Sequence, residues 1–503
     1  MTVYLGIDAG TTSLKAALFD LEGRLLALDR QEYQLVTPRP AWVELDAEVY
    51  WLACQRAVRN ALRQSGVDPG QVKALAISSQ GETLIPVDEN GHPVRRAIVW
   101  LDNRATDQAA EIGRSFDVDQ VYRITGQPEV APTWPACKIL WLRQHEPETF
   151  ARTARFLLVE DFLLHRLTGQ FVSELALHTS SLLLDVQNKT WWQPMLDLVG
   201  LPPEKLGRLL EPGQAVGPLS AKAAASVGLS ASTVAVTGAL DQVVAAVGAG
   251  NIQPGIVTET TGGALAILVT TGQPLFDPQR RVPCHYHARP DTFCLLPWAQ
   301  TAGMALRWFR DQFFPAEAAA ARAEGSEPYD LMGGMAAQVP AGSDGLVVLP
   351  HLEGAACPEF NPAARAVFFG ATLAHTRAHF VRAIMESVAF MLKKNLDIVE
   401  ELGVDVDEVR CTGGGARSDL WLRIKADVLQ KPVTAAMVEE AACLGAALMA
   451  AVATGAFASL EEGVASMVRL RESIEPAQVD HEAYRRGYAQ YLDLYDRLAP
   501  MFR

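Results

Sequence analysis

Residues 5–8 read Leu-Gly-Ile-Asp and residues 9–13 continue Ala-Gly-Thr-Thr-Ser, so an apolar run ends in an acid and a Thr/Gly turn. A second apolar run covers 14–19, and a third follows at 25–28 after the turn residues Asp-Leu-Glu-Gly. Short apolar runs separated by Gly and Asp predict strands joined by tight turns. We therefore expect a β-meander over residues 3–28.

The same pattern returns near the middle of the chain. Residues 256–259 read Ile-Val-Thr-Glu, 260–263 read Thr-Thr-Gly-Gly, and an apolar run covers 264–269. Strand-like and helix-like segments alternate in both halves, at 50–62, 72–78, 234–237, 243–247, 380–399, 409–411 and about 419–429. This alternation predicts an α/β class. The two copies suggest duplicated lobes, 1–252 and 253–503.

Composition excludes several classes of function. The 503 residues carry 44 Lys+Arg and 58 Asp+Glu, a net charge of -14, which argues against nucleic acid as a partner and against a polybasic membrane surface. Seven dispersed cysteines predict reduced thiols in a cytoplasmic protein. Residues 441–458 carry no charge but are rich in Ala and Gly, so we expect a buried, closely packed helix there and no membrane span.

The first turn has the chemistry of a phosphate site. Glycine allows a phosphate to approach the backbone, and Thr hydroxyls can surround its oxygens. Asp8 can hold a magnesium ion through water, and Lys15 adds positive charge. A polar hairpin with a glycine turn is the structural alternative.

Three further stretches carry candidate chemistry. Asp241 follows the strand at 234–237, where an acid can accept a proton from an attacking hydroxyl; a helix N-cap is the alternative. The turn 261–263 can receive phosphates, and the glycine-rich 413–418 leaves backbone exposed for a flat base and ribose.

In this order and spacing the motifs resemble those of the FGGY carbohydrate kinases. The carriers are residues 6–13, 100–104 (Trp-Leu-Asp-Asn-Arg), 241–242, 367–370 (Val-Phe-Phe-Gly) and 413–418. The resemblance covers nearly the whole chain. It implies an α/β, actin-like ATPase (ribonuclease H-like) fold of two duplicated lobes with a cleft between them, the N-terminal lobe binding sugar and the C-terminal lobe binding nucleotide. ATP and Mg²⁺ are the implied cofactors.

Site residues follow from the same resemblance. The implied catalytic base is Asp241, and the implied magnesium ligands, through water, are Asp8 and Asp241. The implied phosphate- and nucleotide-binding residues are Gly10, Thr11, Thr12, Ser13, Lys15, Thr261, Gly262, Gly263, Gly414, Gly415, Ala416 and Ser418. The implied substrate-binding residues are Gln80, Gly81, Glu82, Thr133, Trp134, Asp241 and Gln242.

The substrate loops carry mixed signals. Residues 79–83 (Ser-Gln-Gly-Glu-Thr) and 130–134 resemble glycerol kinases, except that Gly81 replaces an Arg and Thr133 a Tyr. Residues 138–148 and 413–418 resemble xylulokinases, whereas 354–358 (Gly-Ala-Ala-Cys-Pro) depart from that pattern.

We expect an ATP-dependent kinase acting on a neutral sugar of about five carbons, such as the ketopentose xylulose, because Gly81 leaves room and the Glu82 carboxylate favours hydroxyls over anions. The alternatives are a glycerol or polyol kinase and, from another class, a nucleotide-gated ATPase or binding protein without sugar kinase activity. The expected partners are a small sugar or polyol and ATP/ADP. The oligomeric state stays open, a homodimer included.

Overall fold

A computed structural model describes residues 2–477 and 481–502. The chain divides into two compact units. The first comprises 1–252, 272–294 and 440–469, and the second comprises 253–271, 295–439 and 470–503. The sequence predicted a division at 252/253. In the structure, the later segments 272–294 and 440–469 also belong to the first unit.

The main sheet of the first unit has the strand order β13-β14-β5-β1-β2-β3. Its strands are β1 (Val3–Ala9), β2 (Ser13–Phe19), β3 (Leu25–Glu32), β5 (Val72–Ser79), β13 (Ala215–Pro218) and β14 (Val234–Leu240). The first three form the predicted meander, and β1, β5 and β14 run parallel. Short strand pairs decorate the unit: β4 (Glu44–Leu45) with β7 (Ala97–Ile98), β6 (Ile85–Val87) with β8 (Arg155–Leu157), β9 (Val172–Glu174) with β12 (Arg208–Leu210), and β10 (Leu184–Asp185) with β11 (Thr190–Trp191).

The helices of this unit pack on the sheet or around a second, smaller core. They are α1 (Glu48–Ser65), α2 (Thr106–Ser115), α3 (Val118–Thr125), α4 (Pro135–His145), α5 (Pro147–Arg152), α6 (Val159–Thr168), α7 (Leu175–His178), α8 (Gln193–Val199), α9 (Ala221–Val227), α10 (Asp241–Gly248), α16 (Ala441–Ala453) and α17 (Leu460–Met467). One apolar core joins the sheet to α1, α6 and α9, and another lies among α2, α4 and α8.

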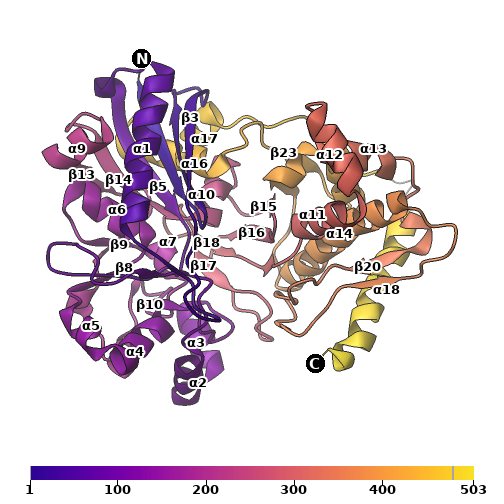
Figure 1. Cartoon of the computed structure of the whole chain (residues 1–503), viewed down its shortest axis with the longest axis horizontal. Helices are drawn as coiled ribbons and strands as arrows, with labels where there is room; N and C mark the ends of the chain where they lie inside the picture. Colours follow the sequence, from indigo (N-terminus) through magenta and orange to yellow (C-terminus); the bar gives the residue numbers. More distant parts are fainter. Residues whose placement is uncertain (1, 478–480, 503) are drawn as a thin grey trace. The chain divides into compact units, whose positions relative to one another are not determined.

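Helix α16 confirms the buried, closely packed helix predicted from the uncharged stretch at 441–458. Figure 1 shows it beside the indigo strands of the chain's beginning, although some 430 residues separate them. A Cβ on Gly6 would lie only 1.8 Å from the Cys443 carbonyl oxygen, so the missing side chain lets the helix lie directly on β1. Among the described residues, no helix is long and apolar enough to cross a membrane.

The second unit repeats the design of the first. Strand β15 (Ile256–Thr261) pairs antiparallel with β16 (Leu265–Thr271) and parallel with β22 (Glu408–Thr412), which pairs parallel with β23 (Val433–Ala435). This order matches that of β1, β2, β5 and β14, so the predicted duplication is confirmed. The remaining strands of the described chain are β17 (Cys284–Tyr286), β18 (Phe293–Leu295), β19 (Trp298–Ala299), β20 (Val347–Leu349) and β21 (Val367–Phe369). The helices of the second unit are α11 (Gly303–Phe313), α12 (Pro315–Ala323), α13 (Pro328–Ala336), α14 (Arg377–Glu401), α15 (Asp419–Leu429) and α18 (His481–Leu498).

Candidate active site

Asp8 lies near the carboxyl end of β1, opposite Lys15 of β2 and beside Ser78 of β5. Ser78 Oγ donates to Asp8 Oδ1 at 3.1 Å, and Lys15 Nζ lies 3.9 Å from Asp8 Oδ2. Burial raises the pKa of Asp8 by more than Lys15 and Ser78 lower it. Burial opposes the charge of Lys15, but Asp8 and Glu440 together raise its pKa. Lys15 donates to Glu440 Oε2 at 2.5 Å, a partner that the sequence did not indicate.

The predicted phosphate turn at 10–13 connects β1 to β2. Gly10 N–H donates to the Ser13 carbonyl at 3.0 Å and closes the turn. Tyr33 donates from its hydroxyl to the Gly10 carbonyl, and Trp100 Nε1–H donates to Thr11 Oγ1 at 2.8 Å. Thr12 is exposed and Ser13 is buried at the start of β2. Two aromatic side chains, Tyr33 and Trp100, thus hold the turn in place by hydrogen bonds, and Thr12 lies at its surface.

Gln80 follows β5, and its side chain is committed to the protein. Its Nε2 donates to the Gly10 carbonyl at 3.1 Å and to the Tyr50 hydroxyl at 2.9 Å, and its Oε1 accepts from Thr83 Oγ1 at 3.2 Å. The residue is 3% exposed. Because β1 and β5 are parallel neighbours, Gln80 links the turn after β1 to the loop after β5. Its contact with substrate stays a prediction.

The loop residue Glu82 adopts a left-handed conformation, with φ 55°. The fully buried Lys138 of α4 donates to the Glu82 carbonyl at 2.8 Å and to the Val99 carbonyl at 3.0 Å. Burial raises the pKa of the Glu82 carboxyl and lowers that of Lys138. A Cβ on Gly81 would lie 2.8 Å from Ser180 Oγ, so a larger residue at this position would crowd Ser180.

Asp241 is the first residue of α10, directly after β14. The helix has Leu240 at its N-cap, so capping does not explain the acid. Its Oδ1 accepts from Gln242 N–H at 2.7 Å. Burial and the charge of Asp8 raise the pKa of Asp241 to about 7, with a smaller contribution from Glu82. Asp8, Glu82 and Asp241, at or just beyond the ends of neighbouring parallel strands, are called the carboxylate cluster below.

The cluster fits magnesium in the chemistry of its donors. Carboxylate oxygens are ligands that magnesium accepts, and the ion usually takes one or two from protein and the rest from water and phosphate. Across residues 2–477 and 481–502, no group of three or more His, Cys, Asp or Glu side chains is arranged as a metal site. A dedicated protein cage is therefore not found in the described chain, whereas Asp8 and Asp241 together can supply the few carboxylates that magnesium needs.

Thr133 and Trp134, the remaining predicted substrate residues apart from Gln242, precede α4. Both are partly exposed. Trp134 Nε1–H donates to the Glu129 carbonyl at 3.1 Å. The same helix delivers Lys138, which the sequence-based site omitted.

In the second unit, the turn at 261–263 has a buried support. Lys425 of α15 forms an ion pair with Glu259 at 2.6 Å, and both side chains are fully buried. Lys425 Nζ also donates to Thr261 Oγ1 at 3.1 Å, and the Thr261 hydroxyl hydrogen-bonds Glu259. The Thr261 hydroxyl thus has two side-chain partners, and its contact with phosphate stays a prediction. Gly262 and Gly263 are exposed and can present backbone.

The glycine-rich turn at 413–418 packs against the same turn. A Cβ on Gly413 would lie 2.8 Å from the Thr261 carbonyl oxygen. Gly415 and Ala416 are buried, whereas Gly414 is exposed. Ser418 Oγ accepts from Trp421 N–H at 3.3 Å and caps α15. Of the predicted residues here, Gly414 is the one whose backbone is open to a ligand.

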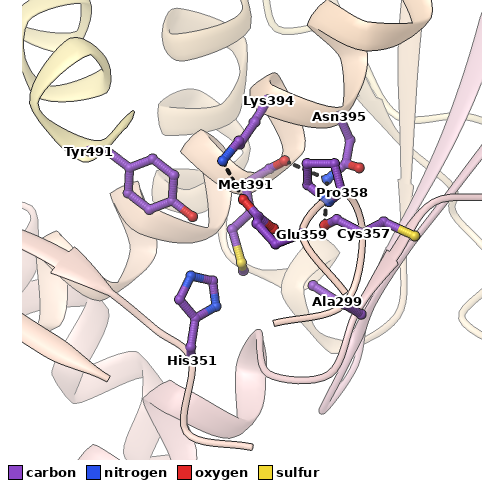
Figure 2. A pocket seen from close by; sticks show the side chains of 10 residues that line it. Ala299, His351, Cys357, Pro358, Glu359, Met391, Lys394, Asn395 and Tyr491 are labelled. Carbon is purple, nitrogen blue, oxygen red and sulfur yellow. Dashed lines mark hydrogen bonds and ion pairs between the residues drawn. The ribbon is translucent and has the colours of Figure 1, made fainter. Parts of the chain in front are cut away.

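A separate small pocket lies elsewhere in the second unit (Figure 2). Its volume is about 10 Å³, room for a single water and far below the size of a sugar site. An ion pair of Lys394 with Glu359 lines it, as does His351, whose Nε2 has no partner within the described structure. Cys357 and Pro358, from the stretch that departs from the xylulokinase pattern, also line it.

Comparison with known proteins agrees with the geometry. The N-terminal domain of the FGGY family of carbohydrate kinases matches residues 3–248, and its C-terminal domain matches 260–454. Xylulose kinase of Bacillus subtilis is 30% identical over 98% of this chain and 97% of its own length. Gluconokinase of the same organism is 30% identical over 96% and 94%.

Solved structures agree as well. The xylulose kinase from Rhodospirillum rubrum superposes with a TM-score of 0.90 at 29% identity, over 99% of each chain. The mixed α/β fold is thus the actin-like fold of these kinases, as predicted. The chain belongs to the FGGY family of carbohydrate kinases and is a sugar kinase.

Proposed function

We propose that the chain transfers the γ-phosphate of ATP to a hydroxyl of a neutral sugar of about five carbons, a ketopentose such as xylulose. The observation that carries this proposal is the carboxylate cluster, whose member Asp241 has a pKa raised to about 7. A carboxylate with a pKa near the working pH is suited to accept a proton from a sugar hydroxyl as that oxygen attacks phosphorus.

The charge of the cluster supports a neutral substrate. Three acids lie together. Two lysines lie beside them: Lys15 is 3.9 Å from Asp8 and donates to Glu440, and Lys138 donates to two backbone carbonyls. Above about pH 7, where Asp241 and Glu82, each with a pKa raised to about 7, are ionised, an anionic sugar would be repelled, whereas hydroxyls would find acceptors there. The relatives named gluconokinase are as similar as those named xylulose kinase, so the sugar must be settled by assay.

Each half of the duplicated design has a role in this proposal. The turn at 10–13 and Lys15 would contact the transferring phosphate, and the exposed backbone of Gly262, Gly263 and Gly414 would hold the rest of the nucleotide. Asp8 and Asp241 would hold magnesium, which when bound supplies positive charge to the phosphate oxygens.

The test is a coupled ADP-release assay with pentuloses, aldonates, glycerol and pentitols. We expect the highest kcat/KM for a pentulose and poor turnover of glycerol. A preference for glycerol would reject the predicted substrate size, and a preference for gluconate would reject the charge argument. ADP release that no sugar accelerates would reject phosphoryl transfer to sugar altogether.

A further inference from the structure

The strand that leads to Asp241 contains a bulge. In the pairing of β14 with β5, Thr237 lies opposite Ile77 and Ala239 opposite Ser78, so Gly238 is an extra residue. A Cβ at this position would lie 1.9 Å from the Ile77 carbonyl oxygen, so only glycine fits. Bulges bend a strand and redirect the side chains that follow. Asp241 comes three residues later.

One buried side chain holds the extra residue. The N–H of Gly238 donates to Glu160 Oε1 at 2.7 Å. Glu160 is 0% exposed and lies in the first turn of α6. Its second oxygen, Oε2, has no partner among the described residues.

A charged carboxylate at position 160 is energetically unfavourable. Burial, together with the nearby Glu174 and Asp161, raises the pKa of Glu160 well above its usual value. An apolar side chain would avoid that cost but would leave the Gly238 N–H buried without an acceptor, which is itself unfavourable. The acceptor atom at this point is therefore the feature that Glu160 contributes.

We propose that Glu160 is a positioning residue: by accepting the Gly238 N–H, it fixes the bulge in β14 and thereby the direction of the Asp241 carboxylate. This inference rests on the proposed role of Asp241 as base. It assigns Glu160 no contact with substrate. To reach the Gly238 N–H, the side chain at position 160 must be as long as that of Glu. To accept the hydrogen bond, it must carry an oxygen, but it need not be charged.

Two substitutions of Glu160 distinguish the effect of side-chain length from that of charge. Glu160→Gln keeps the reach and the acceptor, so its kcat should stay within about threefold of the wild type. Glu160→Asp keeps the charge but withdraws the oxygen by one methylene, so its kcat should fall by about 10- to 100-fold, because a misplacement of about 1 Å can cost 10²-fold. KM for ATP should stay within about threefold in both. The reverse order of the two variants would overturn the proposal.

Glu174→Asp is the matched control. Glu174 is also a fully buried glutamate that accepts backbone N–H groups, but these belong to Ala176 and Leu177 of α7 and not to the bulge. Its shortening should lower the melting temperature as much as that of Glu160 and leave kcat within about threefold. Equal losses of kcat in both variants would show a structural effect and overturn the proposal.

A double-mutant cycle separates this inference from the role of Asp241. In an Asp241→Asn background, Glu160→Asp should lower the residual turnover by less than about twofold, because the group it positions is gone. Independent, multiplying losses would overturn the inference alone. Near-normal turnover of Asp241→Asn by itself would instead reject the proposed base, and the inference with it.

Discussion

Replacement of Lys425 by Met should destabilise the second unit strongly. Lys425 and Glu259 are both fully buried, with 2.6 Å between Nζ and Oε2. Methionine fills most of the volume but leaves the Glu259 carboxylate without a cation, with the Thr261 hydroxyl and the Cys411 thiol as side-chain partners. Breaking a buried ion pair from one side costs about 3–5 kcal/mol, because a charge stays buried without compensation.

The expected loss can be converted to a melting temperature. The unit has about 200 residues, and a domain of that size shifts by roughly 2–4 °C per kcal/mol. Differential scanning calorimetry of Lys425→Met should therefore show a transition lowered by roughly 6–20 °C. The double variant Glu259→Gln/Lys425→Met removes both charges and should recover most of that loss.

Two results would refute the mutual dependence of Lys425 and Glu259. A shift below about 2 °C in Lys425→Met, or a double variant no more stable than the single one, would mean that the buried charges do not depend on each other. Because Lys425 also donates to Thr261 at the base of the predicted nucleotide turn, and both variants lack this hydrogen bond, KM for ATP should rise in both.

Three further predictions concern the carboxylate cluster. The kcat/KM should fall about tenfold per pH unit below about pH 7 and level off above it, because Asp241, with its raised pKa, must be ionised to act as base; a flat profile between about pH 5.5 and 8 would contradict this. Asp8→Asn should raise the magnesium concentration for half-maximal turnover by about tenfold, checked by titration at saturating ATP, and an unchanged titration would remove Asp8 from the metal site. Glu82→Gln should raise kcat/KM for gluconate relative to xylulose in the ADP-release assay, because it removes one repelling charge; an unaltered ratio would count against the charge argument.

The parts of the fold with strong local patterns could be predicted from the sequence. The meander at 3–28 and the helix at 419–429 follow from hydrophobic period and turn residues, and both are confirmed. The assignment of 440–469 to the first unit could not be predicted, because α16 is brought there by packing of Gly6 and other small residues far away in the chain.

The acids of the candidate site could be predicted from the sequence. The residues that contact and position them could be predicted less well. Asp8 and Asp241 follow strand-like runs, which is a readable signal. Lys138, by contrast, lies in a helical segment and looks like any surface lysine until the backbone carbonyls that it contacts are known. Gln80 was assigned to substrate by the family resemblance, and the sequence cannot show that its amide also contacts a neighbouring turn. Acids such as Glu160 are ordinary in the first turn of a helix, so the sequence does not single this residue out.

The most direct test of the account is product formation by the wild type and by Asp241→Ala, with ATP, magnesium and the best sugar of the panel. The phosphorylated sugar should be detected by mass spectrometry for the wild type, and its rate of formation should fall by about 10²–10⁴-fold in the variant, the range for loss of a general base. ATP binding, measured by calorimetry, should be kept. Sugar phosphate formed at a near-normal rate by Asp241→Ala would contradict the central claim.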